Sequence, residues 1–203
     1  MNKNSYCKEI KEVFEKNNGY AKTKDIVKAG INKYHLYKLV EKNKIIKLKN
    51  GLYKWSYPEK SPKEELVEVS KIVPSGVICL LSALSYYELT TTNPWQYYIA
   101  IHRDTHKPKL PEYPPIKIFY FSQKQYKTGI MNREINGNKI QIYDREKTLC
   151  DCFRYRNKIG RDVVNEAFKE YVNGKYINID KLLKYAEKVG PYNELKKYLE
   201  LLL

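Results

Sequence analysis

The chain has 203 residues, 42% hydrophobic and 30% charged, a composition typical of a soluble globular protein with one large or two small domains. Its net charge is +15, and residues 1–57 hold 14 lysines and five acidic residues, a net charge of +9. Basic charge concentrated in one segment attracts phosphate and nominates nucleic acid as a partner, although solvated lysines of a lysine-rich chain are the alternative. The longest apolar run, residues 77–81, is too short to cross a bilayer, which excludes a membrane protein.

Four cysteines are present without the paired spacing of extracellular domains, and no apolar signal segment opens the chain, so we expect a reducing, cytoplasmic location. Cys150 and Cys152 lie two apart on a predicted helix, where their thiols diverge by roughly 200° and cannot jointly hold one metal ion. No phosphate-binding glycine motif or nucleophile elbow is recognised. The sequence therefore predicts no metal, no cofactor and no catalytic residue.

Three helices are predicted in the first 42 residues, the first ending near residues 17–19. A second short helix, residues 24–29, is capped by Thr23 and places Ile26 and Val27 in the core. Gly30 permits a sharp reversal into the third helix, because glycine tolerates positive φ. This order predicts a helix-turn-helix.

The third helix, residues 33–42, is capped by Asn32 and buries Leu36, Leu39 and Val40. Its other face carries lysines and aromatic residues, and in a helix-turn-helix this face enters the major groove of DNA. The candidate groove residues are Lys33, Tyr34, His35, Tyr37 and Lys38.

A basic hairpin follows at residues 45–55, since Asn50-Gly51 between two alternating runs is a strong signal for a tight turn. Together with the helix-turn-helix it predicts a winged helix, with Lys47, Lys49 and Lys54 on the DNA backbone. A small helical domain that binds another protein through the hairpin and tyrosines is the alternative.

Residues 56–62 contain two prolines and predict a linker, so we expect a winged helix-turn-helix domain at 1–57 and a second domain at 58–203. The second domain is predicted to hold helices at 63–73 and 82–89, then strands at 97–101, 116–121, 131–135 and 139–143, then about four more helices. The expected fold class is α+β, with a small mixed sheet in the second domain.

Asp144 and Glu146, followed by Lys147, resemble the acidic core of a metal-dependent nuclease, which would make the chain a nucleic-acid-processing enzyme. Glu146 and Lys147 are adjacent, however, and on a strand adjacent residues face opposite ways. A helix start with acids near the positive end of the dipole is the interpretation that we favour.

Hydroxyl residues lie at the start of the second helix of this domain and in the turn after it. Ser82, Thr90 and Thr91 could line a polar pocket or contact a partner, whereas such hydroxyls more commonly cap helices and satisfy turns.

Three segments together resemble the AbiEi family of antitoxins and transcriptional regulators of type IV toxin-antitoxin systems, which act in abortive phage infection. These are residues 76–95 with their Leu89-Thr90-Thr91 step, residues 143–151 with Asp144-Arg145-Glu146-Lys147, and residues 154–160. The hairpin also ends in a family-like Gly51-Leu52-Tyr53.

The resemblance implies a winged helix that binds inverted repeats of double-stranded DNA in its own promoter and represses the operon. It further implies a second domain that counteracts a nucleotidyltransferase toxin without a stable complex. No catalytic role is carried over. The residues of a possible antitoxin surface are Ser82, Thr90, Thr91, Asp144, Arg145 and Lys147.

Overall fold

The protein, here a computed structural model, is described over residues 3–57 and 62–202. Its N-terminal part is a winged helix: three helices pack on one face of a three-stranded antiparallel sheet of order β1-β3-β2. The elements are α1 (Lys3–Lys16), β1 (Tyr20–Lys22), α2 (Thr23–Lys28), α3 (Lys33–Glu41), β2 (Ile45–Lys49) and β3 (Leu52–Trp55). The predicted winged helix is confirmed, and the short strand β1 was missed.

The turn between α2 and α3 follows the predicted chemistry in part. Gly30 adopts a φ of +75°, and the Asn32 side chain accepts a hydrogen bond of 2.9 Å from the Tyr34 N–H, as expected of a cap. Thr23, in contrast, is the first residue of α2 and not its cap. Val27, which was predicted in the core, is 55% exposed, because the six-residue helix buries a single narrow face.

The wing is the hairpin of β2 and β3, and its turn differs in detail from the expected one. Only Gly51 of the Asn50-Gly51 pair has a positive φ, +76°. The pairing register shifts between Lys47 and Lys49, which is the signature of a bulge next to the turn. The hairpin itself is confirmed.

The second part of the chain is built on a five-stranded mixed sheet of order β6-β5-β4-β8-β7. Pairs β4/β8 and β5/β6 are parallel, whereas β4/β5 and β7/β8 are antiparallel. The strands are β4 (Val77–Ile78), β5 (Tyr97–His102), β6 (Ile116–Phe121), β7 (Ile130–Ile135) and β8 (Asn138–Tyr143). The α+β class and the mixed sheet are confirmed; the two-residue strand β4 was too short to be recognised.

Helices cover both faces of this sheet. They are α4 (Pro62–Ile72), α5 (Leu80–Tyr86), α6 (Gln123–Lys127), α7 (Arg145–Arg154), α8 (Arg156–Ile159), α9 (Arg161–Val172), α10 (Ile179–Val189) and α11 (Tyr192–Leu202). Alternate residues of β5 explain the two layers: Ile99 and Ile101 pack with α4, and Tyr98 and Ala100 pack with α5 and α7. Helix α5 ends earlier than predicted, and α6 was missed.

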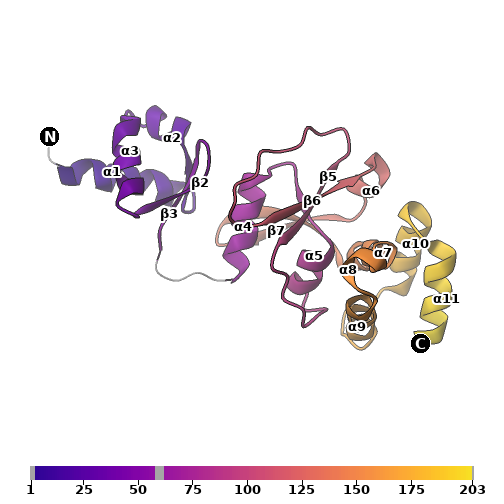
Figure 1. Cartoon of the computed structure of the whole chain (residues 1–203). Coiled ribbons are helices and arrows are strands. Elements are labelled where there is room, and N and C mark those ends of the chain that lie inside the picture. The colour runs from indigo at the N-terminus through magenta and orange to yellow at the C-terminus, as the bar shows by residue number, and fades with distance from the viewer. Residues whose placement is uncertain (1–2, 58–61, 203) are drawn as a thin grey trace.

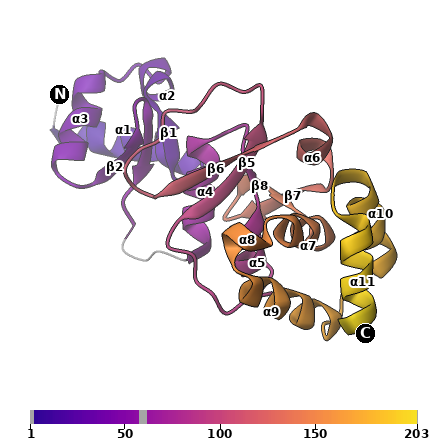
Figure 2. The ribbon, with the colours of Figure 1, turned by 45° about the vertical axis from the view of Figure 1, so that its right-hand side comes forward.

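The winged helix, the sheet with α4, and the helices α7 to α11 follow one another across the molecule (Figure 1). The second view keeps this order, with α10 and α11 side by side at the end far from the winged helix (Figure 2).

The outer face of the wing sheet packs against the second part of the chain. Tyr20, Leu48 and Leu52 join one buried cluster with Leu66 and Val67 of α4. Both faces of β3 are therefore covered, one by the helices of the winged helix and one by α4, and all four of its residues are buried.

Two loops seal the edge of this contact. The Asn18 side-chain amide donates to the Gly137 carbonyl (2.8 Å), and the Asn138 amide donates to the Asn18 carbonyl (3.2 Å). Gly137 has a φ of +73°, and a Cβ there would lie 2.9 Å from the Asn18 side chain, so glycine meets both the turn and the close approach.

Candidate nucleic-acid interface

The outward face of α3 carries exposed aromatic and basic side chains. Tyr34 and Tyr37 are 54% and 44% exposed, and Lys33 and Lys38 are exposed beside them, while Leu36 and Leu39 bury the opposite face. The Lys38 ammonium lies 4.8 Å from the centre of the Tyr34 ring, and its hydrogen bond to Tyr34 raises the pKa of Lys38. Four of the five predicted groove residues thus share one accessible face.

The fifth, His35, points elsewhere. Its ring stacks on Tyr6 of α1 with centroids 3.8 Å apart and planes 14° from parallel, and it is half-buried. This contact anchors α3 on α1 and places the ring away from the outward face.

Of the three predicted wing lysines, the structure leaves only Lys47 exposed. The Lys49 ammonium donates a 2.6 Å hydrogen bond to the Ile72 carbonyl of α4, and burial lowers its pKa. Lys54 is 4% exposed, and its ammonium lies 2.6 Å from a Glu68 oxygen and 3.4 Å from a Glu64 oxygen. The prediction that Lys54 contacts the DNA backbone is wrong, because this lysine holds the winged helix to α4.

The residues named as a metal-dependent core have partners of their own. Asp144 caps α7 by accepting from the Lys147 N–H (2.9 Å), which confirms the predicted helix start. The Lys181 ammonium lies 3.0 Å from Asp144 and 2.9 Å from Glu146, so the space between the carboxylates is already taken by a cation of the protein. Burial opposes the charge of Lys181, but the hydrogen bonds to Glu146 and Asp144 raise its pKa.

Two tyrosine hydroxyls also bond to these carboxylates. With their oxygens engaged by protein groups, the two acids do not favour the interpretation as a metal-dependent enzyme. Tyr171 donates to Glu146 (2.9 Å) and Tyr185 donates to Asp144 (3.0 Å). Among the described residues no group of three or more His, Cys, Asp or Glu side chains is placed to hold a metal ion.

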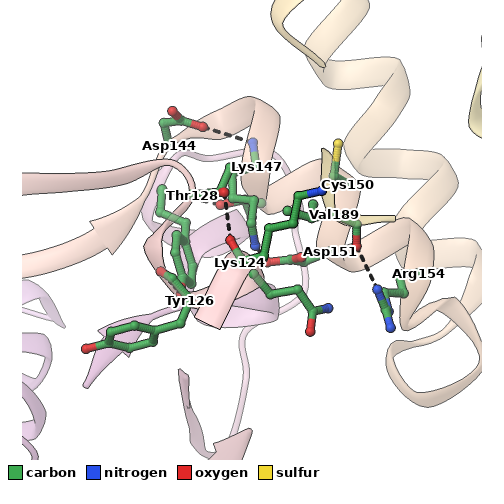
Figure 3. A network of polar contacts seen from close by, with 12 residues as sticks. Lys124, Tyr126, Thr128, Asp144, Lys147, Cys150, Asp151, Arg154 and Val189 are labelled. Carbon is green, nitrogen blue, oxygen red and sulfur yellow. Dashed lines mark hydrogen bonds and ion pairs between the residues drawn. The ribbon is translucent and has the colours of Figure 1, made fainter. Parts of the chain in front are cut away.

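Lys147 turns into the interior and not toward a partner. Figure 3 shows its side chain running from the Asp144 cap toward Asp151. The ammonium pairs with the Asp151 carboxylate and lies 4.3 Å from the Tyr143 ring centre, and both charged side chains are at most 1% exposed. Burial raises the pKa of Asp151, and the neighbouring Lys147 opposes that shift. The expectation that Lys147 belongs to a partner surface is wrong.

Ser82 and Asp144 are also internal. Ser82 is 2% exposed and its hydroxyl accepts from the Tyr98 N–H (2.9 Å), which ties α5 to β5. Asp144 is 8% exposed and engaged as described. Neither side chain is available to a second protein, so both are withdrawn from the antitoxin surface.

Thr90, Thr91 and Arg145 remain near the surface. The two threonines hold Glu166 of α9 through three hydrogen bonds of 2.7 to 2.8 Å, which lower the pKa of Glu166. The Arg145 guanidinium lies 4.7 Å from the Tyr87 ring and 5.2 Å from the Tyr176 ring. Tyr176, 71% exposed, was missed because nothing in the sequence places residue 176 beside residue 145.

A winged helix whose third helix presents exposed aromatic and basic side chains is the architecture typical of DNA-binding modules. Residues 8–53 match the family described as transcriptional regulator, AbiEi antitoxin. The predicted resemblance to AbiEi regulators is thereby confirmed in the winged helix, and it supports a DNA-binding regulatory role. The family description names a regulator and no catalytic activity.

The whole fold is similar to a solved structure, the RV2827C protein from Mycobacterium tuberculosis. The TM-score is 0.62 at 9% sequence identity, and the match covers 91% of this chain and 72% of that one. At this identity the likeness concerns the fold alone. No curated protein matches the sequence. No helix in the described part of the chain is long and apolar enough to cross a membrane.

Proposed function

We propose that the chain is a DNA-binding autorepressor whose helix α3 enters the major groove at inverted repeats in its own promoter. The observation that carries this proposal is the uncovered outward face of α3 with Tyr34 and Tyr37. Both views place α3 on the side of the winged helix away from the five-stranded sheet, so a duplex can approach it (Figures 1 and 2). In this arrangement residues 1–57 act as the DNA-binding domain, and residues 58–203 form the second domain.

The two kinds of side chain on α3 have separate tasks. Lys33 and Lys38 approach phosphates, which carry no sequence information, whereas Tyr34 and Tyr37 reach base edges. We expect Tyr34→Ala and Tyr37→Ala to lose about 1–3 kcal/mol of preference for the promoter duplex over a scrambled duplex. Fluorescence anisotropy with both duplexes measures the preference. If the wild-type chain binds the two duplexes equally well, the proposed recognition of a promoter sequence is contradicted.

The wing lysines give a sharper prediction, because the structure separates them. Lys47→Ala is expected to reduce the slope of log affinity against log salt by about 0.9, the effect of one lost phosphate contact. Lys49→Ala should leave that slope unchanged, since its ammonium is hydrogen-bonded to Ile72. Titrations of the promoter duplex between 50 and 200 mM salt, conditions we choose to keep binding measurable, distinguish the two. An equal decrease of the slope in both variants would contradict the arrangement in which Lys49 is bound to α4 and only Lys47 reaches DNA.

The second domain, in the same proposal, serves as the antitoxin of a type IV system and counteracts a nucleotidyltransferase toxin without stable complex formation. We assign its working surface to Thr90, Thr91, Arg145 and Tyr176, because the other residues expected there are buried. The test is first to look for a nucleotidyltransferase gene beside the gene of this chain, and then to co-express the two. We expect the wild type and the Tyr37→Ala variant to restore growth and Arg145→Ala to fail. Absence of such a neighbouring gene, or equal rescue by Arg145→Ala, would contradict this part.

A further inference from the structure

A hollow of about 390 Å³ lies between the winged helix and α4, away from the α3 face. Lysines from four different elements line it: Lys16 ends α1, Lys22 ends β1, Lys24 lies in α2, and Lys71 lies in the last turn of α4. Its size is within the range of small-ligand sites in proteins. The hollow therefore lies at the junction between the winged helix and the second part of the chain.

Among the described residues that line the hollow, four lysines face one carboxylate. The structure gives none of the four lysines an ion pair within the described residues. That carboxylate belongs to Asp25, and one of its oxygens already accepts from the backbone N–H of Lys22 (2.7 Å). An anion that entered would meet several ammonium groups and one engaged acid.

Lys71 is held in place and is electrostatically strained. It is partly buried, and its ammonium lies 5.5 Å from the centre of the Tyr20 ring. Burial, and then the charge of Lys22, lower the pKa of Lys71; the same two causes lower that of Lys49. Lys22 thus repels two lysines across the junction, and this repulsion would be relieved by a bound anion.

We propose that this hollow binds a phosphate group. The phosphate would contact Lys71 of the second domain and Lys22 and Lys24 of the winged helix. Lysine suits this task, because it binds phosphate as a point charge and needs no fixed planar geometry. Because the ligands come from both halves, a bound phosphate also joins α4 to the winged helix.

Two sources supply a phosphate here. The Thr23 N–H donates to the Gly51 carbonyl (3.1 Å), so the start of α2 lies beside the wing tip, and a DNA backbone that crosses the wing passes near Lys24. In this case the inference rests on the proposed function. The other source is a free phosphate or diphosphate group.

The test uses the full chain with Lys71→Gln. Lys22→Gln is a second variant, which we expect to fold normally because the Lys22 side chain is exposed. Lys188→Gln is the matched control: it removes the same charge from an exposed position of α10, at the far end of the molecule (Figure 1). Two measurements are made on each variant, the salt dependence of binding to the promoter duplex and the shift of Tm with 10 mM pyrophosphate at constant ionic strength.

If the phosphate is that of DNA, Lys71→Gln lowers the salt slope by about 0.9 and the affinity about fivefold at 0.15 M salt, and Lys188→Gln does neither. If it is free, pyrophosphate raises the Tm of the wild type and of Lys188→Gln by about 2 °C or more, but not that of Lys71→Gln or Lys22→Gln. A wild type that does not bind DNA contradicts the proposed function alone, since the pyrophosphate measurement still decides on the hollow. Unchanged values for Lys71→Gln in both measurements overturn the inference.

Discussion

Replacing Asp151 by Ala is expected to lower the free energy of unfolding by about 3–5 kcal/mol, a large part of the 5–15 kcal/mol typical of a folded domain. Lys147 and Asp151 lie one turn apart in α7 with side chains 0% and 1% exposed. Without the carboxylate, the ammonium stays between the Tyr143 and Phe121 rings, whose attraction does not replace a full counter-charge.

Urea unfolding of the single and double variants measures this effect. Lys147→Met together with Asp151→Leu should recover most of the loss, because two apolar side chains of similar size need no solvation. Lys184→Met, at an exposed position of α10, is the control for loss of a lysine and should change stability by less than about 0.5 kcal/mol. A cost below about 1 kcal/mol for Asp151→Ala would mean that water reaches the pair.

The winged helix could be predicted from the sequence because its signals are local. The cap at Asn32, the positive φ of Gly30 and the Asn50-Gly51 turn each act within a few residues. The apolar spacing of Leu36 and Leu39 then fixes which face of α3 is buried and, by difference, which is free.

The roles of the wing lysines could not be predicted for the opposite reason. In an isolated hairpin, the alternation of β3 would point Lys54 toward solvent. Here α4 covers that face and supplies Glu64 and Glu68 to the same ammonium, from residues 10 and 14 positions away. Only the docking of α4 on the wing sheet shows that Lys49 and Lys54 are internal contacts.

The same limit applies to the second domain. The helix start at Asp144 was predicted, since capping is local, but the partners Lys181 and Tyr185 come from α10, about forty residues later. The hydroxyls of Thr90 and Thr91 contact Glu166, which lies 76 and 75 positions later in the sequence. The sequence motifs single out the residues of the expected antitoxin surface, but they do not show that Ser82 and Lys147 are buried.

Lys54→Ala separates the predicted role of this lysine from the observed one. It should lower the free energy of unfolding by about 3–5 kcal/mol, because Glu68, 2% exposed, would keep a buried charge without its principal partner. The salt slope of DNA binding should not change, since the ammonium is turned away from solvent. A backbone contact would give the reverse pattern: little effect on stability and a slope lower by about 0.9.

Glu68→Gln tests how much of the stability of this contact depends on the charge of Glu68. It keeps an oxygen that accepts from Lys54 but removes the charge, so Lys54 retains only the more distant Glu64, at 3.4 Å. We expect an intermediate loss of stability and faster hydrogen exchange of the β3 and α4 amides, because the wing then separates more readily from α4. If Lys54→Ala and Glu68→Gln both unfold as the wild type does, the Lys54–Glu68 pair contributes nothing to joining the two halves, and the other contacts between them are sufficient.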